Sequence, residues 1–202
     1  MNSADHSESS SPWRTRGYLP HWEAGETAQM IGFRLADSLP STLLKRWQEE
    51  LGELPHELAT IERRKRIEAA LDAGHGDAAL AVPLVADMVE KTFLHFDGDR
   101  YRLQAWVVMP NHVHLIATLL RDWTLADIVH SWKSFSSKKA NLLLGRAGTF
   151  WAREYFDRVI RDGNHFANAV AYIERNPVSA GLCGRPESWR YSSAWSGRSS
   201  SK

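Results

Sequence analysis

The segment Trp106–Leu120, WVVMPNHVHLIATLL, determines how the rest of the sequence can be arranged. Two apolar runs flank Pro110-Asn111, a dipeptide typical of a turn, so the segment predicts two strands joined at that point. Because side chains on a strand alternate between faces, His112 and His114 project to the same side of the sheet. Two imidazoles at this spacing can hold one metal ion, although an isolated His-x-His is more often a pair of half-buried structural histidines.

Length and composition predict one globular domain. The chain has 202 residues, of which 43% are hydrophobic and 24% charged, proportions typical of a soluble protein. We expect a disordered tail over residues 1–13, a single domain over 14–196 and a short tail over 197–202. The formal net charge is only +1, so any surface that binds nucleic acid must be local.

The sequence also favours a cytoplasmic location. Cys183 is the single cysteine and cannot form an internal disulfide, which indicates a reducing compartment. No apolar run approaches the roughly 18 residues that a membrane span requires. The opening residues, MNSADHSESSSPW, lack the basic and apolar regions of a secretory signal. We therefore predict a cytoplasmic protein with no membrane partner.

The spacing of apolar residues predicts the other elements around the histidine strand. The expected elements are a strand at 30–36, a helical pair within 41–75, a helix over 84–95, strands over 101–109 and 112–120, a helix over 125–144, a strand over 150–160 and a helix over 166–175 that ends before Pro177. This order predicts an α+β fold of the ferredoxin-like type, an antiparallel sheet covered by helices, with residues 41–75 as a helical insertion after the first strand. The segment Trp189–Trp195 is expected to fold back on the domain.

The second inserted helix contains a dense run of charge, Glu62–Glu68. Such a run is more often a solvated helix face than a functional surface. A patch that faces DNA is the sharper alternative.

The last predicted helix contains two further candidates for a site. Tyr172 and Asn176 are four residues apart, so they share one helix face. The Asn176 amide oxygen is a reasonable third ligand beside two imidazoles, and Tyr172 is then within reach of a phosphate on the same metal. The alternative is that Tyr172 only packs against the core and that Asn176-Pro177 only ends the helix.

The sequence resembles the REP-associated tyrosine transposases, bacterial relatives of the single-strand insertion-sequence transposases of the HUH nuclease superfamily. The similar segments are spread over most of the chain, in the same order: Arg16–His21, Phe33–Ser38, Leu94–Gly98, Ala105–His114, Ser131–Phe135, Phe150–Asp157, Tyr172–Val178 and Trp189–Ala194. His-x-His alone is a weak signal, whereas the ordered set is specific.

The resemblance implies a role for each candidate. His112 and His114 correspond to the paired histidines of the HUH motif, and Asn176 to the third metal-binding position. Tyr172 corresponds to the catalytic tyrosine. Tyr155 is a rival in another family-like segment, but it does not share a helix face with a ligand candidate. The implied cofactor is Mg²⁺ or Mn²⁺, with the two imidazoles favouring manganese.

The implied activity is metal-dependent nicking and joining of single-stranded DNA at palindromic repeat hairpins, through a 5′-phosphotyrosine intermediate. The partner is then single-stranded DNA with an adjacent hairpin, bound by a monomer or a homodimer. Residues 121–161 contain eight lysines and arginines but only four acidic residues, an excess of positive charge that fits a surface that follows phosphates. The DNA-binding candidates in this region are Lys133, Lys138, Lys139, Arg153, Arg158 and Arg161. For Lys138 and Lys139, the alternative that they only form a solvated helix face remains open.

Two other functions remain open from the sequence. The first is a domesticated protein that binds DNA hairpins with little or no turnover. The second is a metallohydrolase that activates water at His112 and His114. The hydrolase is disfavoured because no clear carboxylate base accompanies the histidines, and Glu174 points largely away from Tyr172.

Overall fold

The computed structural model describes residues 13–15, 20–22, 27–120 and 122–197. The tails predicted for 1–13 and 197–202 therefore lie almost entirely outside the described residues, as does most of the family-like segment Arg16–His21. The described N-terminal part contains two short paired strands, β1 (Trp13–Thr15) and β2 (Pro20–Trp22), which the sequence did not predict.

The four strands of the main sheet are all antiparallel to their neighbours. They are β3 (Ala28–Arg34), β4 (Tyr101–Val108), β5 (His112–Leu119) and β6 (Phe156–Val159), in the spatial order β4-β5-β3-β6. This order, with its helical crossovers, confirms the predicted ferredoxin-like α+β fold. The pairing of β3 with β5 places Gly32 opposite His114 and Arg34 opposite His112.

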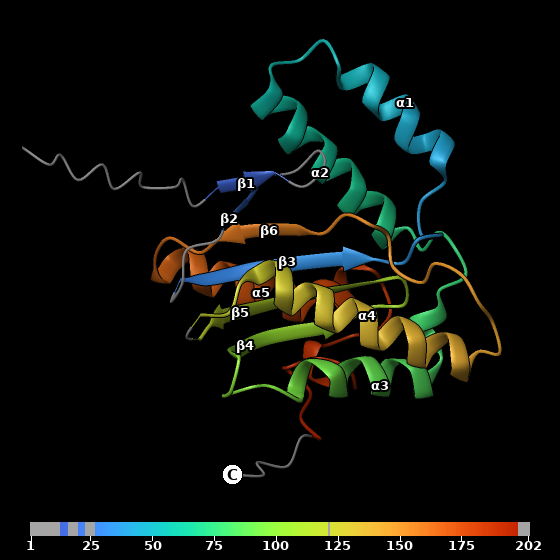
Figure 1. Cartoon of the computed structure of the whole chain (residues 1–202), viewed down its shortest axis with the longest axis vertical. Coiled ribbons are helices and arrows are strands. Elements are labelled where there is room, and N and C mark those ends of the chain that lie inside the picture. Colours follow the sequence, from blue (N-terminus) through green and yellow to red (C-terminus); the bar gives the residue numbers. More distant parts are fainter. Residues whose placement is uncertain (1–12, 16–19, 23–26, 121, 198–202) are drawn as a thin grey trace, which may run out of the picture.

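Helices cover both faces of this sheet (Figure 1). The helices α3 (Pro83–Leu94) and α4 (Leu125–Leu143) pack on one face, and α5 (Gly163–Ser179) packs on the other. The insertion forms α1 (Ser41–Leu51) and α2 (His56–Asp72), as predicted, and short 3₁₀ turns occupy Ala79–Ala81 and Pro186–Ser188. No helix in the described part of the chain is long and apolar enough to cross a membrane.

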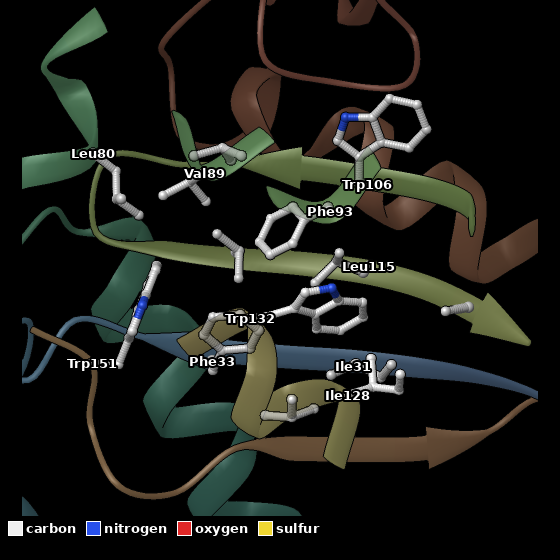
Figure 2. Close-up of a cluster of buried hydrophobic side chains, with 14 of the residues drawn as sticks. Ile31, Phe33, Leu80, Val89, Phe93, Trp106, Leu115, Ile128, Trp132 and Trp151 are labelled. Atoms are coloured by element: carbon white, nitrogen blue, oxygen red, sulfur yellow. The ribbon is translucent and has the colours of Figure 1, made fainter. Parts of the chain in front are cut away.

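The larger apolar core lies between the sheet and the α3–α4 layer (Figure 2). Trp132 is at its centre, with ring centroids 5.4 Å from Phe93 and 5.0 Å from Tyr101, both in edge-on contact. The Trp132 indole N–H donates to the Tyr101 hydroxyl at 2.9 Å, and that hydroxyl donates to the Phe93 carbonyl at 2.7 Å. The aromatic cluster is thus packed without an unpaired polar group on these rings.

The fourth strand is shorter than the predicted 150–160. Trp151 forms only an isolated bridge with Leu35, and regular pairing begins at Phe156. The Trp151 indole N–H donates to Ser136 Oγ of α4 at 2.8 Å, so this residue is anchored to the helix layer. The alternating pattern was correct only for the part of the segment that stays in the sheet.

The prediction that Pro177 ends the last helix was wrong. Helix α5 continues to Ser179 with Pro177 inside its last turn. A proline lacks one backbone N–H, but the N–H of Ala180 still bonds to the Asn176 carbonyl at 3.0 Å and keeps the turn closed. Asn176 is therefore buried within the helix and does not lie at an exposed tip.

The C-terminal segment folds back along the free edge of β4, as predicted. The N–H of Val108 donates to the Tyr191 carbonyl at 2.8 Å, and the N–H of Ser193 donates to the Trp106 carbonyl at 2.9 Å. Arg190 forms an ion pair with the buried Glu90 of α3 at 2.9 Å. These contacts cover a sheet edge that would otherwise expose unpaired backbone groups.

We expect Trp132→Ala to lower the free energy of unfolding by about 3–5 kcal/mol, because it leaves a large cavity in the aromatic cluster. Leu142 lies on the same helix with 75% of its side chain exposed, so Leu142→Ala is the matched control. Its effect should stay within about 0.5 kcal/mol. Urea denaturation followed by circular dichroism measures both. Equal effects of the two substitutions would show that the cluster is not the main core.

Candidate functional site

The two histidines lie side by side on β5 and face helix α5. Their side chains are buried, with 2% of His112 and 5% of His114 exposed, and their ring centroids are 4.9 Å apart. The alternate residues Val113 and Leu115 point into the opposite, larger core. The strand thus places both imidazoles on one face, as its alternation predicts.

Asn111 fixes the orientation of the His112 ring. Its side-chain Nδ2 donates to the carbonyls of Leu71 at 2.9 Å and His75 at 3.3 Å. Its Oδ1 must therefore be the acceptor of the 2.7 Å contact with His112 Nδ1, which places the imidazole proton on Nδ1. The other nitrogen, Nε2, then carries the lone pair that a metal ligand requires.

Helix α5 brings the two other candidates to the histidines. The Asn176 side chain is 2% exposed and within hydrogen-bonding reach of the His112 ring. One turn earlier, the Tyr172 ring centroid lies 5.5 Å from that of His114, and 37% of the tyrosine is exposed. The structure therefore brings together all four residues predicted for the site, three of them buried and the tyrosine open to solvent on one side.

The electrostatic surroundings keep both imidazoles neutral. Burial lowers the pKa of His112 to about 4, and the Asn176 side chain partly opposes this shift. Burial, followed by the charges of His112 and Arg64, lowers the pKa of His114 well below its ordinary value. Neutral imidazoles at physiological pH retain the lone pairs that bind metal ions.

The surroundings of the Tyr172 phenol raise its pKa and so favour its protonated form. Its partial burial, followed by the carboxylates of Glu68 and Asp72, raises its pKa well above the ordinary value, while Arg64 acts in the other direction. The phenol is therefore protonated near neutral pH, and its conversion to a nucleophile requires a nearby positive charge or a proton acceptor.

The buried polar atoms of the site fit a cation. Within the described residues, His114 Nδ1 and Asn176 Oδ1 are buried and make no well-formed hydrogen bond. The Asn176 side chain lies within hydrogen-bonding reach of the His112 ring, and the His114 ring is next to that of His112. The described residues contain no cluster of three His, Cys, Asp or Glu side chains that would hold a metal. A metal ion at the two histidines could take the Asn176 amide as a third ligand, a donor set that suits a hard or borderline divalent ion.

Tyr155 lies in the loop before β6. It lines the pocket that also contains His112 and His114, but it packs against the core on the opposite face of the sheet. Tyr172 is the tyrosine in ring contact with His114.

The predicted DNA-binding residues occupy different surroundings. The Lys133 ammonium donates to the carbonyls of Ala152 at 2.6 Å and Arg153 at 2.8 Å, and burial lowers its pKa to about 8. It therefore holds the loop before β6. The five other candidates are exposed: Lys138 and Lys139 on α4, Arg153 in that loop, Arg158 on β6 and Arg161 just after β6. The α4 lysines lie on the sheet face opposite the histidines.

Sequence reasoning missed several residues of this site. Asn111 was read only as a turn residue, although its position directly before His112 places it against that ring. Gly32 gives His114 its space, since a Cβ at position 32 would lie 2.8 Å from His114 Nδ1. Arg64 and Glu68 belong to the charged run noted in the sequence and Asp72 follows it, but no local pattern connects this helix to β5.

The family comparison covers the four residues predicted for the site. A family described as "Transposase IS200 like" matches residues 58–176, which include both histidines, Tyr172 and Asn176. The chain belongs to this family. A REP-associated tyrosine transposase of Escherichia coli (strain K12) is 27% identical over 110 residues. That alignment covers 52% of this chain and 62% of the relative, so the chain spans less than two thirds of that protein's length.

A solved structure of a REP-associated tyrosine transposase bound to a REP hairpin shares the fold. The TM-score is 0.54 at 18% sequence identity, with 88% of this chain and 82% of that chain covered. The predicted resemblance to these IS200-like transposases is thereby confirmed.

We expect Gly32→Ala to displace the His114 ring, because the new methyl group would overlap Nδ1. The free energy of unfolding should fall by about 1–3 kcal/mol, the usual effect of overpacking. The imidazole resonances of His114 should shift in ¹H–¹⁵N NMR spectra. Gly163 has open space around its Cβ position, so Gly163→Ala is the control and should leave these resonances unchanged. Unshifted His114 resonances in Gly32→Ala would show that the ring does not depend on this close approach.

Proposed function

We propose that the protein is a metal-dependent single-strand DNA nicking and joining enzyme in which Tyr172 is the nucleophile. The carrying observation is the convergence of Tyr172 on His114, in the same site as His112 and Asn176. Membership of the IS200-like transposase family supports a DNA-processing role.

His112, His114 and Asn176 would hold a Mg²⁺ or Mn²⁺ ion. Such an ion would supply Lewis-acid stabilisation of the charge on a phosphate oxygen. The protein contributes the fixed ligands: Asn111 orients the His112 ring, and Gly32 leaves room for the His114 ring.

Tyr172 performs the covalent step. Its hydroxyl oxygen attacks the scissile phosphorus, a new O–P bond forms, and the P–O3′ bond breaks in line with the attack. The products are a 5′-phosphotyrosine and a DNA strand with a free 3′-hydroxyl, which takes up a proton. The phenol proton must leave during the attack, and Glu68 and Asp72 are carboxylates whose charges already act on this phenol. A second 3′-hydroxyl can reverse the step, which joins strands.

Hairpin-forming repeats are the proposed substrate. The curated relative is a REP-associated transposase, and the structural neighbour was solved with a REP hairpin. Arg158 on β6 and Arg161 between β6 and the start of α5 precede the tyrosine helix in the chain and are proposed to contact the single strand. Arg153, Lys138 and Lys139 are proposed to contact more distant phosphates, and Lys133 to hold their loop. The oligomeric state is proposed to be a monomer or a homodimer, in a cytoplasmic setting.

We expect Tyr172→Phe to abolish a covalent DNA–protein adduct, because the substitution removes the attacking oxygen and leaves the ring. Labelled hairpin DNA with single-stranded flanks is incubated with protein and Mn²⁺ and then separated on an SDS gel. Tyr155→Phe is the matched control and should form the adduct at the wild-type level.

Two results of this assay would contradict the proposal. Loss of the adduct only in Tyr155→Phe would move the nucleophile to that residue. Tight hairpin binding without cleavage, under Mg²⁺ and Mn²⁺ alike, would support a hairpin-binding protein without turnover.

We expect Asn111→Ala to weaken Mn²⁺ binding by about 10–100-fold, because it removes the group that orients His112. Electron paramagnetic resonance of free Mn²⁺ measures the affinity. Asn141 donates to the Gly148 carbonyl away from the site, so Asn141→Ala should bind Mn²⁺ normally.

Removal of metal with EDTA should lower the thermal stability of the wild-type protein but not that of a His112→Ala/His114→Ala variant. Unchanged Mn²⁺ affinity in the double variant would place the metal elsewhere.

A further inference from the structure

Helix α2 lies outside the ferredoxin-like plan but is connected to the site. Asn111 donates to the carbonyls of Leu71 and His75, at the C-terminal end of α2 and just beyond it. The charges of Arg64, Glu68 and Asp72 act on Tyr172. The insertion therefore contacts Asn111, which orients His112, and its charges act on Tyr172.

An open pocket of about 110 Å³ lies between the insertion and the sheet, with both histidines in its wall. Most of the remaining wall is apolar, and α1, α2, β3, β5 and β6 all contribute. The apolar lining residues are Phe33, Leu44, Ile67, Leu71, Val113 and Phe156. An apolar wall of this kind suits the face of a flat aromatic ring, and a nucleobase is the ring that a DNA strand presents.

Arg64 lies at this pocket with a fixed orientation. Its guanidinium carbon is 3.7 Å from the centroid of the Phe156 ring, and its Nε donates to Glu68 at 2.9 Å. A guanidinium has five N–H donors, so one carboxylate contact leaves it able to bind a phosphate as well. Its charge reaches both His114 and Tyr172. Arg64 therefore shares a pocket wall with both histidines and lies in electrostatic reach of the proposed nucleophile.

Other cations reinforce the positive character of this region. Arg34 and Arg63 also line the pocket. The pKa of Arg34 is lowered mainly by its burial and, to a smaller extent, by the charge of Arg63. The pKa of Arg158 is likewise lowered mainly by its burial and then by the charge of Arg64. Like charges that oppose one another in this way are stabilised by a bound anion.

We propose that the insertion and the adjoining ends of β3, β5 and β6 form a nucleotide site for single-stranded DNA, in which the pocket accepts the base adjoining the scissile phosphate and Arg64 binds that phosphate. The identity of the phosphate rests on the proposed function. The binding of a nucleotide does not, so the two can be tested separately. The insertion then holds the substrate while Tyr172 attacks it.

The test uses full-length Tyr172→Phe protein, which cannot form the covalent bond. The four deoxynucleoside 5′-monophosphates and the corresponding nucleosides are titrated in the presence of Mg²⁺ and followed by ¹H–¹⁵N NMR. We expect at least one monophosphate to shift the imidazole resonances of His112 and His114. Adding Arg64→Ala should weaken that nucleotide at least tenfold and leave nucleoside binding nearly unchanged. Arg66 is on the same helix but pairs with Glu50 and Glu62, so Arg66→Ala should have no effect.

Two further variants make the test independent of one substitution. Glu68→Gln removes the carboxylate that competes for Arg64, so nucleotide binding should equal or exceed that of the parent protein. Thr60→Trp fills the pocket from a half-buried position on α2 and should weaken nucleotides and nucleosides alike. For a dT12 strand, Arg64→Ala should reduce the slope of log affinity against log salt by about 0.7, the value for one phosphate contact on a single strand.

Equal nucleotide affinity in the Arg64→Ala and Arg66→Ala proteins would overturn the nucleotide site. A normal covalent adduct from an Arg64→Ala protein that retains Tyr172 would do the same and leave the proposed function intact. Nucleotide binding that depends on Arg64, without any adduct from wild-type protein, would keep the nucleotide site and overturn the proposed function.

Discussion

The register between β3 and β5 is the constraint on which the rest of the structure depends. Strand β5 is buried on both faces, so its alternate residues serve two environments: Val113 and Leu115 in the larger core, His112 and His114 in the site. A slip by one residue would exchange the two sets and place both imidazoles in the apolar core. The same register sets Gly32 opposite His114, which is the position where the absence of a Cβ leaves room for the ring.

Much of the fold could be predicted from the sequence because its elements have strong local signals. The inserted helices begin after Pro40 and Pro55, and the long helix begins at Thr124, whose side chain accepts from the Asp127 N–H. The errors arose where tertiary contacts override local pattern. Trp151 bridges to Leu35 and bonds to Ser136 of α4, but regular pairing of the last strand begins only at Phe156. Pro177 is tolerated because it falls in the last turn of α5.

The site was predictable in its parts but not in its assembly. Spacing placed the histidines on one face of a strand, and Tyr172 with Asn176 on one face of a helix. Neither pattern gives the distance between strand and helix, so only the structure shows the ring contact of His114 with Tyr172. The role of Asn111 was hidden for a similar reason. Its partners, the carbonyls of Leu71 and His75, lie 40 and 36 residues away in the chain.

The buried polar atoms of the site lower the stability of the fold unless something binds them. A buried polar atom without a partner costs roughly 1–3 kcal/mol, and in the described residues both His114 Nδ1 and Asn176 Oδ1 are of this kind. A fold selected for stability alone would place apolar side chains at these positions, as it does around them at Ile116 and Ile173. A cation that binds the acceptors would recover this cost, since any ligand that binds only the folded state stabilises it. The insertion contributes to the same balance, because the Asn111 contacts that orient His112 also anchor the end of α2. Loss of these contacts would release both the ring and the helix, which makes the inserted pair part of the site's architecture and not an appendage to it.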